Sequence, residues 1–348
     1  MVLLTATLIV KDESARLARC LASVADLVDR VVVVDTGSTD DTVAIATAAG
    51  ATVHHEAWRD DFAHARNVAL ALVTTPWALV IDADEELVDT DVAETRERLA
   101  TPDALPDILL VRERLRYPGK GPTGEPDEAL ILAPRLLKMS AKPRYLHAVH
   151  EQLDVSDAPA ALSNLTLLHH GYADPSALRR KEARNLRLAE RMERHPHALH
   201  CIARAALSLG EWGKTVEAGD ALLAHPDSSP ALRREAAVLA ALAALGAKDT
   251  ARFGHFLAQA QRVDPTHVDV LHLALLAAAS RYATAVRRGA QREPELALRP
   301  PLLFHDTSAV LAMIASLTRR SGAGAGAAPG SASPSSTVPV TTTPGGWR

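Results

Sequence analysis

The chain has 348 residues, of which 47% are hydrophobic, and this supports folded cores in about two domains. Lys and Arg number 38 against 42 Asp and Glu, so the formal net charge of −4 disfavours a dedicated nucleic-acid binder, which normally carries a basic excess. Two cysteines, Cys20 and Cys201, are too few for a disulfide framework or a cysteine zinc site. No apolar run reaches the length of a transmembrane segment, and we expect a soluble, cytoplasmic protein.

The first hundred residues alternate between short β-branched runs and segments of helical period. The N-terminal run lacks a basic leader and a cleavage site, so we interpret it as a strand rather than a signal peptide. Four strands alternating with four helices indicate βαβ units around a largely parallel sheet. The expected strands are Leu4–Val10, Val31–Val34, Ala51–His54 and Trp77–Ile81, and the expected helices are Ser14–Ala25, Asp40–Ala49, Phe62–Val73 and Val92–Leu99.

Between Pro102 and His170 the pattern changes to strands separated by loops rich in Pro and Gly. We expect the second, mixed half of the same sheet here, with a flexible loop at about 115–128. The predicted strands are Ile108–Arg112, Leu130–Leu132, Leu146–Val155 and Leu162–His170.

The rest of the chain divides into a helical region and a tail. Leu209-Gly210 recurs as Leu245-Gly246, 36 residues later, which is close to the period of tetratricopeptide-like helix pairs, and a weaker third unit is expected at 268–292. We therefore predict an α/β domain at 1–172 and helical repeats at 173–316. Residues 317–348, rich in Gly, Ala, Ser, Pro and Thr, are predicted to be disordered.

Carboxylates follow two of the predicted strands. Asp82 and Asp84 come directly after the fourth strand, where open α/β sheets bind ligands, and hard oxygen ligands suit Mg²⁺ or Mn²⁺ on a diphosphate. The structural alternative is a helix start, since Asp is a common N-cap. Asp35 ends the second strand before Gly37, and it is placed to accept hydrogen bonds from a base or a ribose. N-capping explains the polar residues after Gly37 but not Asp35.

Three further segments are candidates for chemistry. Trp58–Asn67 combines two of the scarce aromatic residues with Arg66, which lies either on a solvated helix face or against a nucleotide. His147–Glu151 and His169–Tyr172 offer a carboxylate base and imidazole metal ligands. With 15 histidines in the chain, such pairs also arise by chance.

Taken together, these segments resemble family 2 glycosyltransferases of the GT-A fold. The resemblance covers about residues 3–195 and includes, besides those motifs, His170-Gly171-Tyr172 and Lys181 with Arg184-Asn185, which are similar to a bacterial subgroup with tetratricopeptide-like helices. One departure is Lys11-Asp12-Glu13, where the family more often has Lys-Asn-Glu.

The resemblance implies a role for each matching residue. Asp35 would contact the uracil, Arg66 would support the nucleotide, and Asp82 would face the ribose or a metal-bound water. Asp84 and His170 would bind the divalent metal (Mn²⁺ or Mg²⁺), and Glu151 would be the catalytic base.

The implied activity is metal-dependent, inverting transfer of a sugar from a nucleotide-diphospho-sugar, a UDP-sugar in this expectation, to an unknown peptide, protein or glycan acceptor. Two alternatives remain: a nucleotidyltransferase acting on a sugar phosphate, and a non-catalytic repeat scaffold. A nucleotidyltransferase usually has a glycine-rich loop after the first strand, and none follows Val10. The helices either bind a partner, self-associate or cap the sheet.

Overall fold

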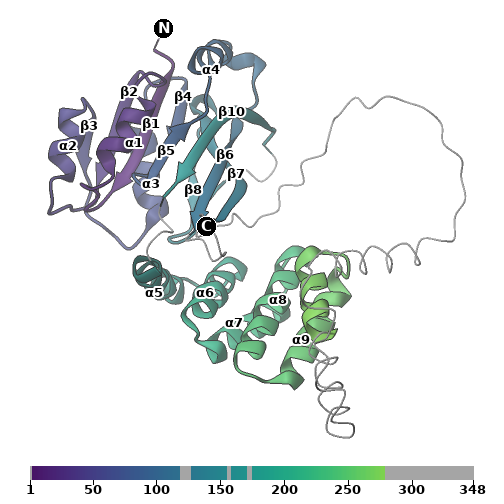
Figure 1. Ribbon diagram of the computed structural model, residues 1–348. Coiled ribbons are helices and arrows are strands. Elements are labelled where there is room, and N and C mark those ends of the chain that lie inside the picture. The colour runs from purple at the N-terminus through teal and green to yellow at the C-terminus, as the bar shows by residue number, and fades with distance from the viewer. Residues whose placement is uncertain (1, 118–126, 155–157, 171–174, 279–348) are drawn as a thin grey trace, which may run out of the picture. The chain divides into compact units, whose positions relative to one another are not determined.

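The computed structural model of the protein describes residues 2–117, 127–154, 158–170 and 175–278 (Figure 1). Residues up to Val263 belong to one compact unit, and a second unit begins at Asp264. The predicted tail at 317–348, most of the predicted loop at 115–128 and the end of the third repeat unit lie outside the described residues. None of the helices in the described ranges has the length and apolarity that a membrane crossing requires.

The N-terminal half is an α/β arrangement around an eight-stranded mixed sheet, as predicted. The strand order is β3-β2-β1-β4-β7-β6-β10-β5, in which β1, β2, β3 and β4 are parallel and β7 runs antiparallel to both β4 and β6. The strands are β1 (Leu4–Val10), β2 (Arg30–Asp35), β3 (Thr52–His55), β4 (Trp77–Val80), β5 (Glu85–Val88), β6 (Ile108–Tyr117), β7 (Asp127–Lys138) and β10 (Ala160–His169). The helices are α1 (Leu17–Val24), α2 (Thr42–Ala48), α3 (Phe62–Ala71) and α4 (Val92–Leu99).

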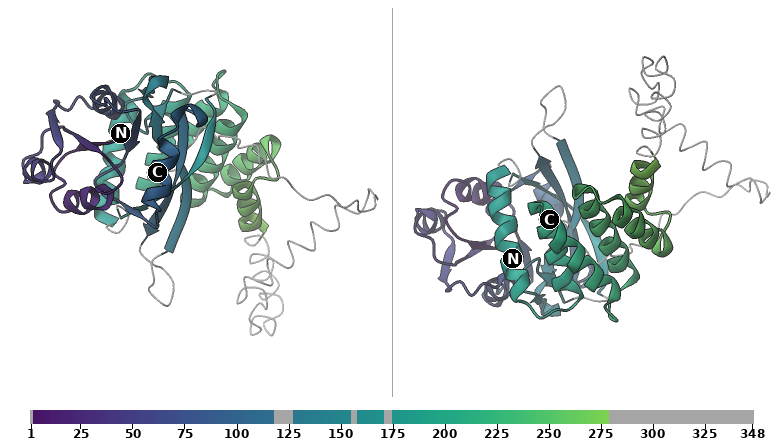
Figure 2. Two further views of the ribbon diagram at one scale, coloured as in Figure 1. Left: turned by 90° about the horizontal axis from the view of Figure 1, so that it is seen from above. Right: turned by 90° about the horizontal axis from the view of Figure 1, so that it is seen from below.

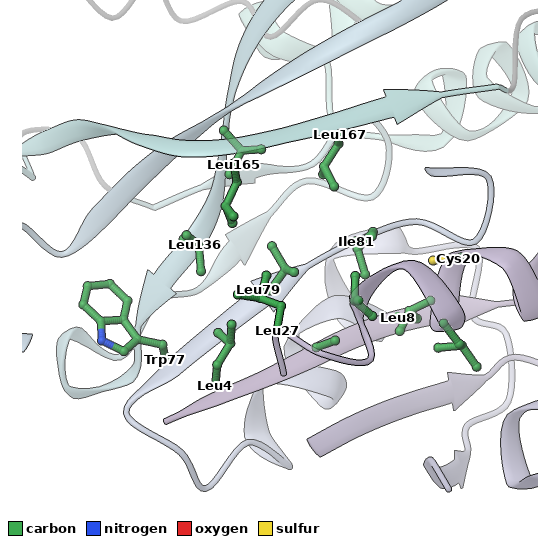
Figure 3. Close-up of a cluster of buried hydrophobic side chains, with 14 of the residues drawn as sticks. Leu4, Leu8, Cys20, Leu27, Trp77, Leu79, Ile81, Leu136, Leu165 and Leu167 are labelled. Atoms are coloured by element: carbon green, nitrogen blue, oxygen red, sulfur yellow. The ribbon is translucent and has the colours of Figure 1, made fainter. Parts of the chain in front are cut away.

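Both faces of the central strands are covered, which explains their nearly continuous apolar sequence. Because successive side chains point to opposite faces, β4 contributes to two separate cores. Trp77 and Leu79 pack with Leu4 and Leu8 in one core, which Figure 3 shows. The other residues of the strand pack with α3 on the opposite face; these are Ala78 and Val80.

The structure excludes the structural alternative for Asp82 and Asp84. They do not start a helix, because a tight turn leads directly into the edge strand β5, which the sequence analysis did not predict. The predicted strand Leu146–Val155 is wrong: the backbone forms the two-residue strands β8 (Tyr145–Leu146) and β9 (Gln152–Leu153), which pair with each other around a sharp turn. His147 and His150 have positive φ angles of 73° and 49°, which no extended strand accommodates.

Helices follow the sheet, as expected. They are α5 (Pro175–Arg191), α6 (Pro196–Leu209), α7 (Trp212–Ala224), α8 (Pro230–Gly246) and α9 (Thr250–Val263). Figure 2 shows them as successive neighbours coloured teal to green, and it also shows the long paired strands β6 and β7. Gly210 ends α6 in the left-handed conformation, which glycine adopts without steric cost. The boundary at residue 172 and the tetratricopeptide-like character of the helices stay predictions.

Candidate active site

The carboxyl ends of β1, β2 and β4 meet at one edge of the sheet, because these strands are parallel neighbours. Val10 pairs with Asp35 in register, and Ile81 donates its N–H to the carbonyl of Thr7. The predicted residues Asp35 and Asp82 therefore lie at the ends of β2 and β4, on either side of β1. This is the position at which open α/β sheets bind ligands.

Asp35 organises the turn after β2. Its carboxylate accepts hydrogen bonds from the N–H groups of Gly37 and Ser38, at 3.1 to 3.3 Å, and pairs with Nδ1 of His55 at 3.2 Å. Burial opposes ionisation, but the hydrogen bonds from Ser38, His55 and Gly37 outweigh it and lower the pKa of Asp35. Gly37 has a φ of 104°, a conformation that glycine allows. The turn thus presents an ionised carboxylate at the sheet edge.

Arg66 joins two predicted site residues. From α3, its Nη2 donates to Oδ1 of Asp82 at 2.9 Å and its Nε donates to Oε1 of Glu151 at 2.6 Å. The guanidinium also lies 5.7 Å from the centre of the Tyr145 ring. Burial lowers the pKa of Arg66, but Asp82 and Glu151 more than compensate and raise it overall. Arg66 is 6% exposed, so it does not lie on a solvated helix face.

A second buried arginine, Arg135, also contacts Asp82. Arg135, on β7, donates to Oε1 of Glu85 at 2.6 Å and to Oε1 of Glu113 at 2.5 Å, and its Nη2 lies 3.3 Å from Oδ2 of Asp82. Burial raises the pKa of Asp82, but Arg66 and Arg135 reverse this and hold it well below its usual range. Burial, Asp82 and Glu113 raise the pKa of Glu85 to about 8, against the opposing charge of Arg135. Asp82 is thus a fixed anion between two fixed cations.

The histidine that faces Asp84 is His169, the residue before the one that we predicted. His169 Nε2 lies 3.6 Å from Oδ2 of Asp84, whereas His170 Nε2 lies 3.0 Å from Oε2 of Glu86. The reason is the alternation of side chains at the end of β10, which sends neighbouring residues to opposite sides. His170 still contacts Asp84, but through its backbone N–H, which donates to the carbonyl of Asp84.

The donors near Asp84 fit a divalent cation only in combination with a substrate. In the residues that the structure describes, no three His, Cys, Asp or Glu side chains are grouped so that they could hold a metal ion. Asp84 and His169 supply one oxygen and one nitrogen, and the Asp84 side chain is 21% exposed. Mg²⁺ is commonly held by one or two carboxylates together with phosphate oxygens and water. The pair fits such a site, completed by a diphosphate.

Glu151 sits on a turn that other residues hold in place. Asn67, next to Arg66 on α3, brackets the backbone of Tyr145: its Nδ2 donates to the carbonyl at 2.9 Å and its Oδ1 accepts from the N–H at 2.8 Å. On the other side, His197 of α6 stacks on His147 with ring centroids 4.0 Å apart and bonds the carbonyl of Val149 at 3.0 Å. Both the sheet domain and α6 therefore position the Glu151 turn.

The two aromatic residues of Trp58–Asn67 pack against the helices that follow the sheet. Trp58 and Phe62 pack edge to face, with centroids 4.8 Å apart, against an apolar cluster formed largely by α5 and α6. Asp60 adds an ion pair to Arg191 at 2.5 Å. The segment thus secures the helices to the sheet domain because its aromatic surface finds apolar partners there.

Asn67 and His169 lie within candidate segments of the sequence analysis, but neither was given a role of its own. Four further residues of the site were not assigned from the sequence; these are Glu85, Glu113, Arg135 and Tyr145. A signal existed for one of them, because Arg135 places a charge within the otherwise apolar run 129–137 of β7. Its pairing with Glu113 and Glu85, however, depends on the pairing between β6 and β7 and on the turn after β4.

Open α/β sheets bind ligands at the carboxyl ends of their parallel strands, and in this protein those ends carry the carboxylates of Asp35 and Asp82. Residues 6–116 match the family model described as Glycosyl transferase family 2. Residues 6–116 therefore carry a family 2 glycosyltransferase domain, as the sequence motifs predicted, and a helical region follows the mixed sheet.

Known proteins similar to the chain match parts of it. A TPR repeat-containing protein of Synechococcus elongatus is 53% identical over 106 residues, which are 30% of this chain and 26% of that protein. The SPbeta prophage-derived glycosyltransferase SunS of Bacillus subtilis is 29% identical over 198 residues, 55% of this chain and 45% of that protein. The chain thus spans between a quarter and a half of the length of these relatives.

A solved structure of a glucosyl-3-phosphoglycerate synthase from Mycobacterium tuberculosis, in complex with Mn²⁺, UDP and glucosyl-3-phosphoglycerate, is also similar in sequence. It is 26% identical, the match covers 33% of this chain and 44% of that chain, and the TM-score is 0.27.

Proposed function

We propose that the protein transfers a sugar from a UDP-sugar to an acceptor nucleophile, with a divalent cation and with inversion at the anomeric carbon. The observation that carries the proposal is the arrangement around Arg66, which joins Asp82 at a strand end to Glu151 on a separate turn. A nucleotide site and a candidate base are thereby coupled through one side chain. The family 2 domain supports this choice of reaction.

In this proposal the donor lies along the carboxyl ends of β2 and β4. Asp35 accepts a hydrogen bond from the uracil, and Asp82 faces the ribose while Arg66 and Arg135 hold its carboxylate. Both cations keep that carboxylate ionised, so it acts only as an acceptor. Asp84 and an imidazole would hold Mn²⁺ or Mg²⁺, which supplies charge neutralisation for the departing diphosphate. His169 is better placed for this than His170.

Glu151 is the proposed general base. A base must come within hydrogen-bond distance of the proton that it removes, and Oε1 of Glu151 accepts from Arg66 in this structure. The second carboxylate oxygen therefore faces the acceptor, while Arg66 fixes the orientation of the group. One in-line displacement then inverts the configuration, and general-base assistance contributes about 10²–10⁴-fold in rate.

Incubation with a panel of UDP-, GDP- and dTDP-sugars plus Mn²⁺ tests the proposal. We expect release of UDP, even with water as the acceptor, and abolition of that release by EDTA. Exchange of pyrophosphate would instead indicate a nucleotidyltransferase. Absence of nucleotide-sugar binding, measured by thermal shift, would indicate a scaffold and overturn the proposal.

A further inference from the structure

Arg184, on α5, is a partly buried cation that is oriented but not neutralised. Its guanidinium carbon lies 4.7 Å from the centre of the Phe62 ring. Its Nε and Nη2 donate to Oδ1 of the buried Asn185, at 3.4 and 3.2 Å. Among the residues that the structure describes, no carboxylate forms an ion pair with it.

The partial burial of the Arg184 charge is energetically unfavourable in the protein without a bound ligand. Burial lowers the pKa of Arg184, and the carboxylates of Glu151 and Glu182 oppose that shift without approaching to ion-pair distance. Withdrawing a charge from water is costly unless a partner of opposite charge compensates. The ring of Phe62 compensates in part, as cation–π contacts do. A bound anion would complete the neutralisation.

The position of Arg184 relates it to one end of the site. Phe62, whose ring lies under the guanidinium, donates its N–H to the carbonyl of Ala148 at 2.9 Å. Ala148 belongs to the turn that carries Glu151, which bonds Arg66. Arg184 therefore lies beside the Glu151 turn, whereas Asp82 is contacted by Arg66 and Arg135.

We propose that Arg184 binds an anionic group, a phosphate or a carboxylate, of the acceptor. The proposal rests on the proposed function, since a base at Glu151 places the acceptor's nucleophile beside it. A planar guanidinium with a fixed orientation suits oxyanions, which it binds through parallel N–H groups.

Inorganic phosphate is the probe for this inference. We would titrate it by calorimetry into the full chain saturated with UDP and Mn²⁺, for the wild type and for Arg184→Gln, Arg184→Lys and Arg187→Gln. Arg187 is an exposed arginine of the same helix, so Arg187→Gln is the matched control. We expect Arg184→Gln to weaken phosphate binding at least about tenfold, the change that corresponds to ~1.4 kcal/mol. The phosphate affinity of Arg184→Lys should lie between those of the wild type and Arg184→Gln. The phosphate affinity of Arg187→Gln should equal that of the wild type.

The outcomes separate this inference from the proposed function. Equal phosphate affinity in the wild type and Arg184→Gln, or no phosphate binding by the wild type, overturns the inference even if UDP release is normal. Weaker UDP binding by Arg184→Gln with unchanged phosphate binding assigns Arg184 to the donor and also overturns it. Phosphate binding that depends on Arg184, in a chain that releases no UDP, supports the anion site and overturns the proposed function.

Discussion

Arg66 and Glu151 are 85 residues apart in the sequence, yet Nε of Arg66 lies 2.6 Å from Oε1 of Glu151. The remaining end of the guanidinium bonds Asp82, so one side chain satisfies two carboxylates from different parts of the fold. Breaking one partner of a buried ion pair leaves the others without compensation. The arrangement therefore makes stability and activity depend on the same residue.

Arg66→Met should remove both ion pairs while keeping a side chain of similar length. We expect the free energy of unfolding to fall by about 3–5 kcal/mol, because Asp82 and Glu151 lose their shared cation. Chemical denaturation measures this loss, and UDP release measures the accompanying loss of activity. Arg59→Met removes only an exposed pair with Glu56 and should change stability by less than about 1 kcal/mol. Equal effects of the two substitutions would contradict the structural role of Arg66.

Asp84→Asn should abolish metal-dependent turnover and leave the fold intact. The carboxylate is partly exposed, so its removal leaves no unpaired buried charge. We expect UDP release in Mn²⁺ to fall by roughly 100-fold or more, since several kcal/mol of charge stabilisation depends on the cation. Asp89→Asn, an exposed change five residues away, is the control. Activity of Asp84→Asn close to that of the wild type would exclude Asp84 as a metal ligand.

His169→Ala and His170→Ala should differ in their metal dependence. His169 faces Asp84, so its loss should raise the Mn²⁺ concentration needed for half-maximal activity by roughly tenfold or more. His170 pairs with Glu86 instead, and its loss should leave that concentration nearly unchanged. A Mn²⁺ titration of UDP release distinguishes them. The opposite ranking would support the assignment that the sequence motif implied.

Stability should decline with acid because of the imidazoles around the Glu151 turn. Burial lowers the pKa of His150 to about 3, and nearby cations and imidazoles add to that shift. Burial also lowers the pKa of His197 to about 4, with help from neighbouring imidazoles and against the hydrogen bond to the carbonyl of Val149. The unfolded chain, with values near 6.5, binds these protons first, so stability is highest above pH 6.5 and falls as the pH decreases toward 4.

Each buried imidazole should contribute a slope of up to about 1.4 kcal/mol per pH unit in that range. Urea unfolding between pH 4.5 and 7.5 measures the slope, and His197→Gln should reduce it. His255→Gln, at an exposed position of α9, should leave it unchanged. A slope that His150→Gln and His197→Gln both leave intact would show that other groups cause the acid sensitivity.

Gly246→Ala should destabilise the helical region through a steric clash. A Cβ at this position would lie 2.9 Å from Cε2 of Trp212 and 3.0 Å from its Cζ2. Overpacking of this kind typically costs about 1–3 kcal/mol. Gly254→Ala, within α9, meets no atom within 4 Å and should instead stabilise by about 0.4–1 kcal/mol. Opposite signs in thermal unfolding are expected, and a stabilising Gly246→Ala would contradict the packing.

The local pattern of the sequence was sufficient for most of the N-terminal fold. Strand β1 and helix α4 have the predicted limits, because periodicity and flanking polar residues mark them within a single segment. The strand-end positions of Asp35 and Asp82 also followed, since parallel strands bring their carboxyl ends together. The sequence failed at Leu146–Val155, where the turn depends on Asn67 and His197, which belong to other parts of the chain.

The length and composition of the chain limited the class of protein, and its motifs identified the family 2 domain. Only the tertiary structure decided which charged side chains form ion pairs with one another. The pairing of Arg135 with Glu113 and Glu85, and of Asp84 with His169, depends on strand register and on the direction of each side chain. A one-residue difference reverses the face to which a strand residue points. Motifs therefore predicted the region of the candidate site, while side-chain geometry decided which residues meet there.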